Sequence, residues 1–246
     1  MGFGVSAPAF GYDDYADVDV EGKIVAYISG APSSLPSNER AYYSSGAPKS
    51  GEAIARGAVG TVSFSSPDDP RFRWENSVNR SSTGSFFWVE RAGDPRGGAS
   101  QIRASASLNH PAVRALFEGS PTPLEDVFSA AASNSAQGFD LPAELTMRVA
   151  TTHSPVDSDN VIAKLEGSDP DLRDEHVVYV AHVDHFGVGV AVDGDAIYNG
   201  AHDNASGTSI VLEIAKAFAA LPEAPRRSVI FLFVTAEEWG LLGSDY

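Results

Sequence analysis

Three short clusters of histidine and carboxylate residues could carry out chemistry in this sequence. They centre on His182 and Asp184, on Asp203, and on the adjacent pair Glu237 and Glu238. The chain of 246 residues contains no cysteine, so a metal site must use imidazole and carboxylate ligands. Such a donor set suits hydrolytic zinc, and a shared carboxylate suits two metal ions roughly 3.5–4 Å apart.

The first cluster, His182-Val183-Asp184-His185, ends an apolar run. Residues two apart on a strand point to the same side, so His182 and Asp184 share a side. His182 can offer one ring nitrogen to a metal while Asp184 holds the other ring nitrogen or the nearby loop. A histidine at a strand end is more often an ordinary polar residue, so this cluster by itself leaves both interpretations open.

The second cluster, residues 200–207, stands before a predicted helix and contains Asp203, Asn204 and Ser206. Each of these residue types can cap a helix. A helix has only one N-cap position, however, so capping explains only one of the three residues. The small residues on both sides allow the backbone to come close to a ligand. Because each carboxylate oxygen can take one cation, Asp203 could bridge two.

The third cluster places Glu237 and Glu238 directly after another apolar run. It could be a solvated turn, but two adjacent carboxylates at the end of a buried strand repel each other. Consecutive side chains point in different directions. One glutamate can therefore bind a metal while the other stays free as a general base.

The elements that must position these clusters form a regular pattern in the second half of the chain. Strands are predicted at residues 144–150, 160–166, 176–181 and 228–235, a loop at 183–207, and a helix from the apolar spacing at 210–219 to Pro222. The apolar run 176–181 predicts a strand buried on both faces. The alternation predicts a mostly parallel sheet, whose carboxyl ends would carry all three clusters.

The first half is richer in Gly, Ser, Pro and Ala and predicts a small α/β unit. The predicted elements are strands at residues 23–28, 61–64 and 85–89, helices at 51–58, 111–118 and 124–132, a surface loop at 65–84 and a linker at 133–138. We therefore predict one domain over residues 1–135 and a second over 136–246.

Charge and hydropathy exclude several functional classes. The formal net charge is −16 with a pI of about 4.6, which disfavours binding to nucleic acid or to anionic lipid. No stretch approaches the roughly 18–20 apolar residues of a membrane span. No signal peptide is visible in the first residues. We therefore expect neither nucleic acid nor membrane partners.

The three clusters, with the continuation Glu237-Glu238-Trp239-Gly240 to Tyr246, resemble metallopeptidase family 28 over roughly residues 144–246. These are di-zinc aminopeptidases and their carboxypeptidase relatives. The resemblance implies two zinc ions, peptide substrates and a zinc exopeptidase fold. It also implies that His182 and Glu238 each bind one zinc ion, that Asp203 bridges both, that Glu237 is the general base and that Asp184 orients His182.

Residues 1–135 resemble a protease-associated domain, with its opening at residues 11–15, 20–25 and 57–60. The expected fold class is therefore α/β, a partial, mostly parallel, doubly wound sheet preceded by a small α/β protease-associated domain. The resemblance also implies a secreted, periplasmic or cell-surface protein.

The sequence departs from this family in ways that predict an internal fragment of a longer protein. The family has two further ligands downstream of the Glu237–Glu238 motif, and His185 and His202 match neither, so both are predicted to be ordinary polar residues. We expect the chain alone to bind zinc weakly or at one site and to be inactive. We also expect strand 228–235 to lie at a sheet edge.

Three other functions remain open for the parent protein. They are a related carboxypeptidase or dipeptidase, a one-zinc glutaminyl cyclase, and a non-catalytic binding protein on the same fold. The zinc content of the chain and its activity on aminoacyl compared with glutaminyl substrates would separate them.

Overall fold

The computed structural model describes residues 2–69, 72–90, 93 and 102–246. The chain divides into two compact units, one comprising Met1–Thr83 and Gly97–Thr152, the other Gly84–Arg96 and His153–Tyr246. The sequence prediction placed a boundary at 135/136. In the structure the first unit continues to Thr152, and Ala136 and Phe139 pack against its core.

The first unit is built on a parallel sheet in the order β3 (Ile24–Ile28), β4 (Gly60–Phe64) and β5 (Ala104–Ser107). Helices α1 (Ser37–Ser44) and α2 (Gly46–Ala55) connect β3 to β4, and α3 (Trp74–Thr83) precedes β5. The remaining elements are α4 (His110–Leu116), α5 (Leu124–Ala132), the antiparallel pair β1 (Ser6–Ala7) and β2 (Tyr12–Asp13), and the 3₁₀ turn Pro8–Phe10. The predicted order of strand, helix and strand is confirmed.

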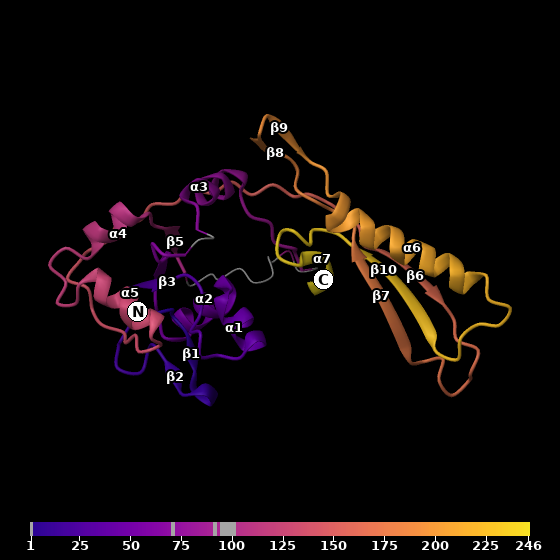
Figure 1. Cartoon of the computed structure of the whole chain (residues 1–246), viewed down its shortest axis with the longest axis horizontal. Coiled ribbons are helices and arrows are strands. Elements are labelled where there is room, and N and C mark those ends of the chain that lie inside the picture. Colours follow the sequence, from indigo (N-terminus) through magenta and orange to yellow (C-terminus); the bar gives the residue numbers. More distant parts are fainter. Residues whose placement is uncertain (1, 70–71, 91–92, 94–101) are drawn as a thin grey trace. The chain divides into compact units, whose positions relative to one another are not determined.

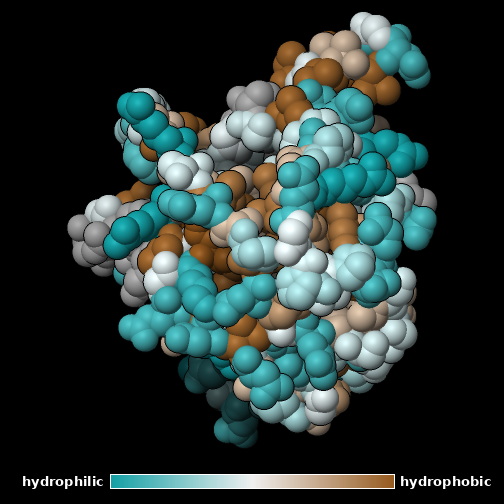
Figure 2. Space-filling model, turned by 90° about the vertical axis from the view of Figure 1, so that its left-hand side faces the viewer, coloured by the Kyte–Doolittle hydropathy of each residue, from teal (hydrophilic) through white to brown (hydrophobic). Residues whose placement is uncertain are grey.

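Helical spacing explains how the first unit buries its core. Leu124, Val127 and Ala131 of α5 fall on one helix face and are buried together with Ile28 and Phe64 of the sheet. Viewed from the side of α4 and α5, hydrophobic residues lie in hollows between hydrophilic ones (Figure 2).

The second unit has a mixed sheet in the order β6 (Val161–Leu165), β10 (Ser228–Val234) and β7 (His176–His182). Strands β10 and β7 are parallel, whereas β6 is antiparallel to β10. Helix α6 (Ser206–Ala219) runs along the sheet (Figure 1) and buries Val211 against it, in one core with Phe231 and Phe233. The remaining elements are the hairpin of β8 (Gly187–Val192) and β9 (Asp195–Tyr198), the π-helical turn Ala201–Ala205, and α7 (Leu242–Asp245).

Four local predictions are wrong. Residues 144–150 form no strand, since no strand of the described chain pairs with them. The predicted strand at residues 85–89 does not form: residues 85–88 have no strand structure, and Val89 makes only an isolated bridge. The predicted surface loop contains α3, whose Glu75 lies in the first turn, where the helix dipole favours a carboxylate. The predicted loop 183–207 contains the β8–β9 hairpin.

Two expectations about the apolar strands are also wrong. Strand β7 is not buried on both faces, because in the described chain it pairs only with β10, and its Val178 and Val180 are exposed. Strand β10 is not at an edge, because β6 and β7 flank it. The mixed α/β class is confirmed, with the parallel pair β10 and β7 in the sheet of the second unit. Within the described ranges no helix is long and apolar enough to cross a membrane.

Candidate metal centre

The parallel register of β7 and β10 brings the first and third clusters together. His182 is the last residue of β7 and lies opposite Val234, the last residue of β10. The loops that carry Asp184 and Glu237 therefore leave the sheet side by side. The Thr208 hydroxyl donates to the His182 carbonyl at 2.9 Å, which fixes the start of α6 beside the same strand end.

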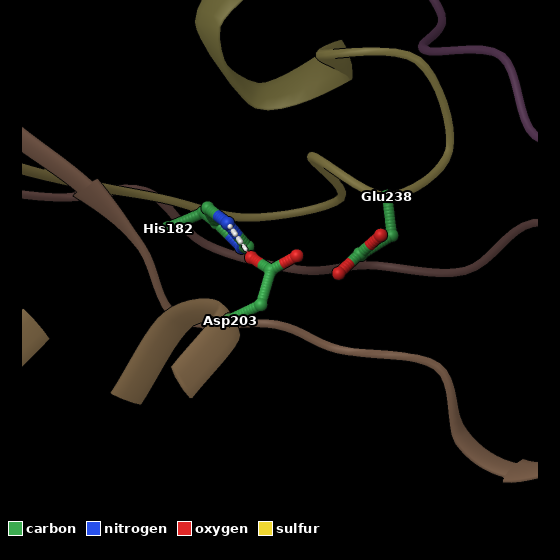
Figure 3. A group of neighbouring side chains, drawn as sticks. All are labelled: His182, Asp203 and Glu238. Atoms are coloured by element: carbon green, nitrogen blue, oxygen red, sulfur yellow. Dashed lines mark ion pairs between the residues drawn. The ribbon is translucent and has the colours of Figure 1, made fainter. Parts of the chain in front are cut away.

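The structure brings His182, Asp203 and Glu238 to one point, although they come from three segments. One potential ligand atom from each lies within 4.8 Å of the others. The His182 Nε2 atom is 2.9 Å from Asp203 Oδ1, and the Asp203 carboxylate lies between His182 and Glu238 (Figure 3). This is the convergence expected for the carboxyl ends of neighbouring parallel strands.

Asp184 connects the first and third clusters through backbone groups. Its carboxylate oxygens accept hydrogen bonds from the backbone N–H groups of Glu237, at 3.1 Å, and Glu238, at 3.3 Å. Its backbone carbonyl lies 3.1 Å from His182 Nδ1, nearer than its carboxylate at 3.7 Å. Asp184 thus contacts the His182 ring and also holds the turn that carries both glutamates.

The two glutamates have different environments. The Glu238 side chain is 11% exposed, and its Oε1 lies 2.6 Å from His185 Nδ1. The Glu237 side chain is 31% exposed, and its Oε2 lies 3.8 Å from His182 Nε2. One carboxylate is therefore held by a second imidazole, while its neighbour stays accessible beside the metal-ligand candidates.

His185 and His202 were both predicted to be ordinary polar residues. His202 is exposed. His185 contacts Glu238, which sequence reasoning missed, because nothing in the spacing of two residues 53 positions apart identifies this pair.

The surroundings of His182 raise its pKa. Burial of the imidazole lowers its pKa, but the Asp184 carbonyl and the carboxylates of Glu237, Asp184 and Asp203 raise it, and the net shift is upward. Within the described residues the site therefore gathers negative charge around one imidazole, the electrostatic environment that a bound cation stabilises.

Asn160 holds the loop that carries both glutamates, a role that no sequence pattern predicted. Its Oδ1 accepts from the Thr235 backbone N–H at 3.0 Å, and its Nδ2 donates to the Gly243 carbonyl at 2.6 Å. Both ends of the loop are thereby tied to one side chain at the start of β6. A Cβ atom at Gly243 would collide with the Thr235 carbonyl oxygen, so only glycine fits.

The small residues of the second cluster permit the close packing that was predicted. Gly200 has φ +64° and a Cβ there would lie 2.7 Å from His185 Cβ. A Cβ at Gly207 would collide with the Asn204 side chain, whose Oδ1 accepts from the Gly207 N–H at 3.0 Å. Gly200 thus lets this loop lie close to the first cluster, and Gly207 leaves room for the Asn204 side chain within the loop.

The candidate metal centre lies in a part of the chain that matches a known protein family. Residues 160–246 match peptidase family M28. We call these residues the M28 segment, after the family that they match. The M28 segment contains His182, Asp184, Asp203, Glu237 and Glu238, so every site candidate identified from the sequence lies within it.

Curated relatives of the chain come from fungi. A "Probable zinc metalloprotease" of Pyrenophora tritici-repentis is 40% identical over 95 residues, which are 37% of this chain and 18% of that protein. One of Pyrenophora teres f. teres is 35% identical over 120 residues, which are 48% of this chain and 23% of that protein. The chain thus spans about a fifth of the length of these relatives.

Solved structures similar to the chain include two bacterial proteins. The aminopeptidase from Aneurinibacillus sp. strain AM-1 has a TM-score of 0.39 and 20% identity, with coverage of 99% of this chain and 43% of that one. BSAP, a zinc aminopeptidase from Bacillus subtilis, has a TM-score of 0.34 and 19% identity, with coverage of 99% and 42%.

Proposed function

We propose that the protein carrying this chain is a zinc-dependent exopeptidase, an aminopeptidase that hydrolyses N-terminal residues of peptides. The observation that carries the proposal is the convergence of His182, Asp203 and Glu238 with Glu237 beside them. The M28 segment and the names of the fungal relatives support zinc as the metal and peptides as the substrates.

The donor set fits zinc. One imidazole and two carboxylates are common ligands of a catalytic zinc, which keeps a further position open. The His182 and Asp203 donors are 2.9 Å apart, and all three donors lie within 4.8 Å of one another. We propose that His182 and Glu238 would each hold one zinc ion and that Asp203, which lies between them, would be shared by both.

Glu237 is proposed as the general base. Bound zinc would polarise the scissile carbonyl and acidify water. Glu237 is accessible and is not engaged by His185, so it can accept the proton of the attacking water and deliver it to the leaving amine. Asp184 supports this role by holding the backbone of the Glu237–Glu238 turn and by fixing the His182 ring.

For residues 1–135 we propose a protease-associated domain, and for the protein a secreted or cell-surface location. Both proposals are supported by the sequence resemblance.

Zinc binding tests the metal centre directly. Elemental analysis of the purified chain should find zinc, and Asp203→Asn or Glu238→Gln should lose it. Glu213→Gln, which alters an exposed carboxylate on α6 paired with Lys216, is the matched control and should retain zinc. Zinc content that is independent of Asp203 and Glu238 would refute the proposed ligands.

Activity tests the reaction. Because the chain supplies three of the proposed ligands, we expect weak or single-site zinc binding and no hydrolysis of a leucyl chromogenic amide by these 246 residues alone. The parent protein should hydrolyse that amide and should leave an N-acetylated peptide intact. Preferential cleavage of the N-acetylated peptide from its carboxyl end, or cyclisation of a glutaminyl substrate, would support one of the alternative enzymes instead.

A further inference from the structure

A short segment from the first half of the sequence packs within the second unit. Residues 84–96 belong to the second unit, although the parts of the chain that flank them belong to the first. We call residues 84–89, all of which the structure describes, the strap. The strap follows α3 and precedes β5, so it interrupts the sequence of the first unit between two of its own elements.

The strap contacts the stretch of chain that follows the two glutamates. The Trp88 indole Nε1 donates a hydrogen bond to Asp245 Oδ2 at 2.8 Å, and the Trp88 ring lies edge to face with the Tyr246 ring, with centroids 5.4 Å apart. The ring centroids of Phe86 and Trp239 lie 4.6 Å apart. The strap therefore holds this stretch at two places, directly after the glutamate pair and at the end of α7.

Trp88 is the main anchor of the strap. It is half-buried, whereas its strap neighbours Phe86, Phe87 and Val89 are 41%, 54% and 55% exposed. Both of its contacts are attractive, since edge-to-face rings and a hydrogen bond to a carboxylate add to the burial of apolar area. The attachment of the strap thus depends on few contacts, and removal of the Trp88 side chain should release it.

The loop that carries the glutamates needs to be held by its surroundings. Ala236 and Leu241, which flank the pair, have φ angles of +52° and +63°, a region that residues with a side chain rarely adopt. Such conformations persist where the surrounding structure imposes them. Asn160 and Asp184 hold this loop from the ends of the strands, and the strap holds it through Trp239 and α7. Release of the strap would therefore let the loop relax and move both glutamates.

We propose that the strap keeps Glu237 and Glu238 in the geometry that binds zinc and that Trp88 is a positioning residue for the proposed reaction. The proposal rests on the proposed function, which assigns Glu238 to zinc and Glu237 to the attacking water. Because both flanks of the strap belong to the first unit, it also gives the first unit a means of controlling the metal centre. Release of Trp88 would loosen the glutamate turn without altering any ligand.

Zinc affinity and local hydrogen exchange of the 246-residue chain test this proposal. By chelator competition, Trp88→Ala should weaken zinc binding about tenfold, as contacts that support metal ligands from outside do. In zinc-free buffer the hydrogen-bonded amides of Gly240, Leu241 and Leu242 should exchange faster, whereas those of β7 and β10 keep their rates. Trp88→Phe, which retains a ring, should lose less affinity. Phe87→Ala, which removes an exposed ring of the strap, is the matched control and should behave like the unaltered chain.

A double-mutant cycle tests the hydrogen bond between Trp88 and Asp245. Asp245→Ala removes the acceptor and should weaken zinc binding in the unaltered chain, but it should add little to Trp88→Ala, because both variants break the same contact. Asp245→Asn keeps an oxygen that can accept from the indole and should retain most of the affinity. Additive losses in the double variant would contradict the assigned contact.

Two further results would overturn the proposal. One is zinc affinity and loop exchange in Trp88→Ala that equal those of the unaltered chain. The other is faster exchange that extends equally to β7 and β10, which would show a general loss of stability. Failure of the metal centre is distinguishable from failure of the strap. If the unaltered chain binds no zinc, the metal centre is contradicted, and loop exchange in zinc-free buffer still decides whether the strap holds the turn.

Discussion

The two units treat charged side chains in opposite ways. In the first unit, Lys49 is 2% exposed and donates to the carbonyls of Phe3 and Gly30 at 2.5 Å and of Ile28 at 3.3 Å. Asp14, 1% exposed, accepts from the Val5 N–H at 3.0 Å. These charges are compensated within their own unit, where they hold the N-terminal segment against the sheet.

The second unit gathers several carboxylates at one end of its sheet, and they face one another. Asp203 and Glu237 flank one imidazole, and the Asp203 side chain is 65% exposed. Buried charge in the first unit therefore serves the fold, whereas the carboxylates of the second unit form an arrangement that a cation would complete.

The largest effect is expected at Glu237. If the proposed peptidase function holds, Glu237→Gln preserves the shape of the side chain and removes the base, so turnover should fall by about 10²- to 10⁴-fold. Zinc content should stay near that of the unaltered protein, because Glu237 is not a proposed ligand. Steady-state kinetics with elemental analysis measures both quantities. Unchanged turnover would disprove the role.

Zinc should stabilise only the second unit. A ligand at 100 times its dissociation constant adds about 2.7 kcal/mol to the stability of the unit that binds it. Hydrogen exchange of β7 and β10 should slow accordingly, while exchange of β3 stays constant. His182→Ala should abolish the effect. Equal protection of both units would show that zinc does not act at the proposed centre.

Removal of the Asn160 side chain should weaken zinc binding without altering a ligand. Asn160→Ala frees both ends of the loop that carries Glu237 and Glu238, and outer contacts of this kind change metal affinity by about 10- to 100-fold. We expect the lower end of that range in a zinc titration. Ser158→Ala, which removes an exposed contact to the Thr235 hydroxyl, is the matched control. Equal losses in the two variants would contradict the specific role of Asn160.

The first unit should become more stable as the pH rises from 8 to 9.5. Burial lowers the pKa of Lys49 from 10.5 to about 8, so above pH 8 the unfolded chain binds more protons at this residue than the folded chain. Stability therefore rises with pH, by about 1–2 kcal/mol over this range. Burial raises the pKa values of Tyr12, Tyr15 and Tyr27, which opposes the trend above about pH 10.

Urea unfolding at several pH values, read by hydrogen exchange of β3, measures this dependence. Lys49→Met should remove it, because no proton is then bound differently at that position. A pH dependence that persists in Lys49→Met would assign the effect to another group.

Much of the site could be predicted because it depends on local pattern. The apolar runs now seen as β7 and β10 are separated by one amphipathic helix, and such strands run parallel. Adjacent parallel strands end at the same edge of a sheet, so the residue types that follow the two strands predicted that His182, Glu237 and Glu238 lie close together. The glycines of the second cluster likewise indicated close packing around Asp203.

Only the tertiary structure decided contacts between residues far apart in the sequence. His185 meets Glu238, Asn160 meets Gly243, and Phe86 meets Trp239, with no local pattern that pairs them. The exposure of each strand likewise depended on the strands that pair with it. Strand β10 lies between β6 and β7, whereas β7 lies at an edge of the described sheet. Periodicity reports which face of a segment is apolar, but the partners of that face depend on the packing of the whole chain.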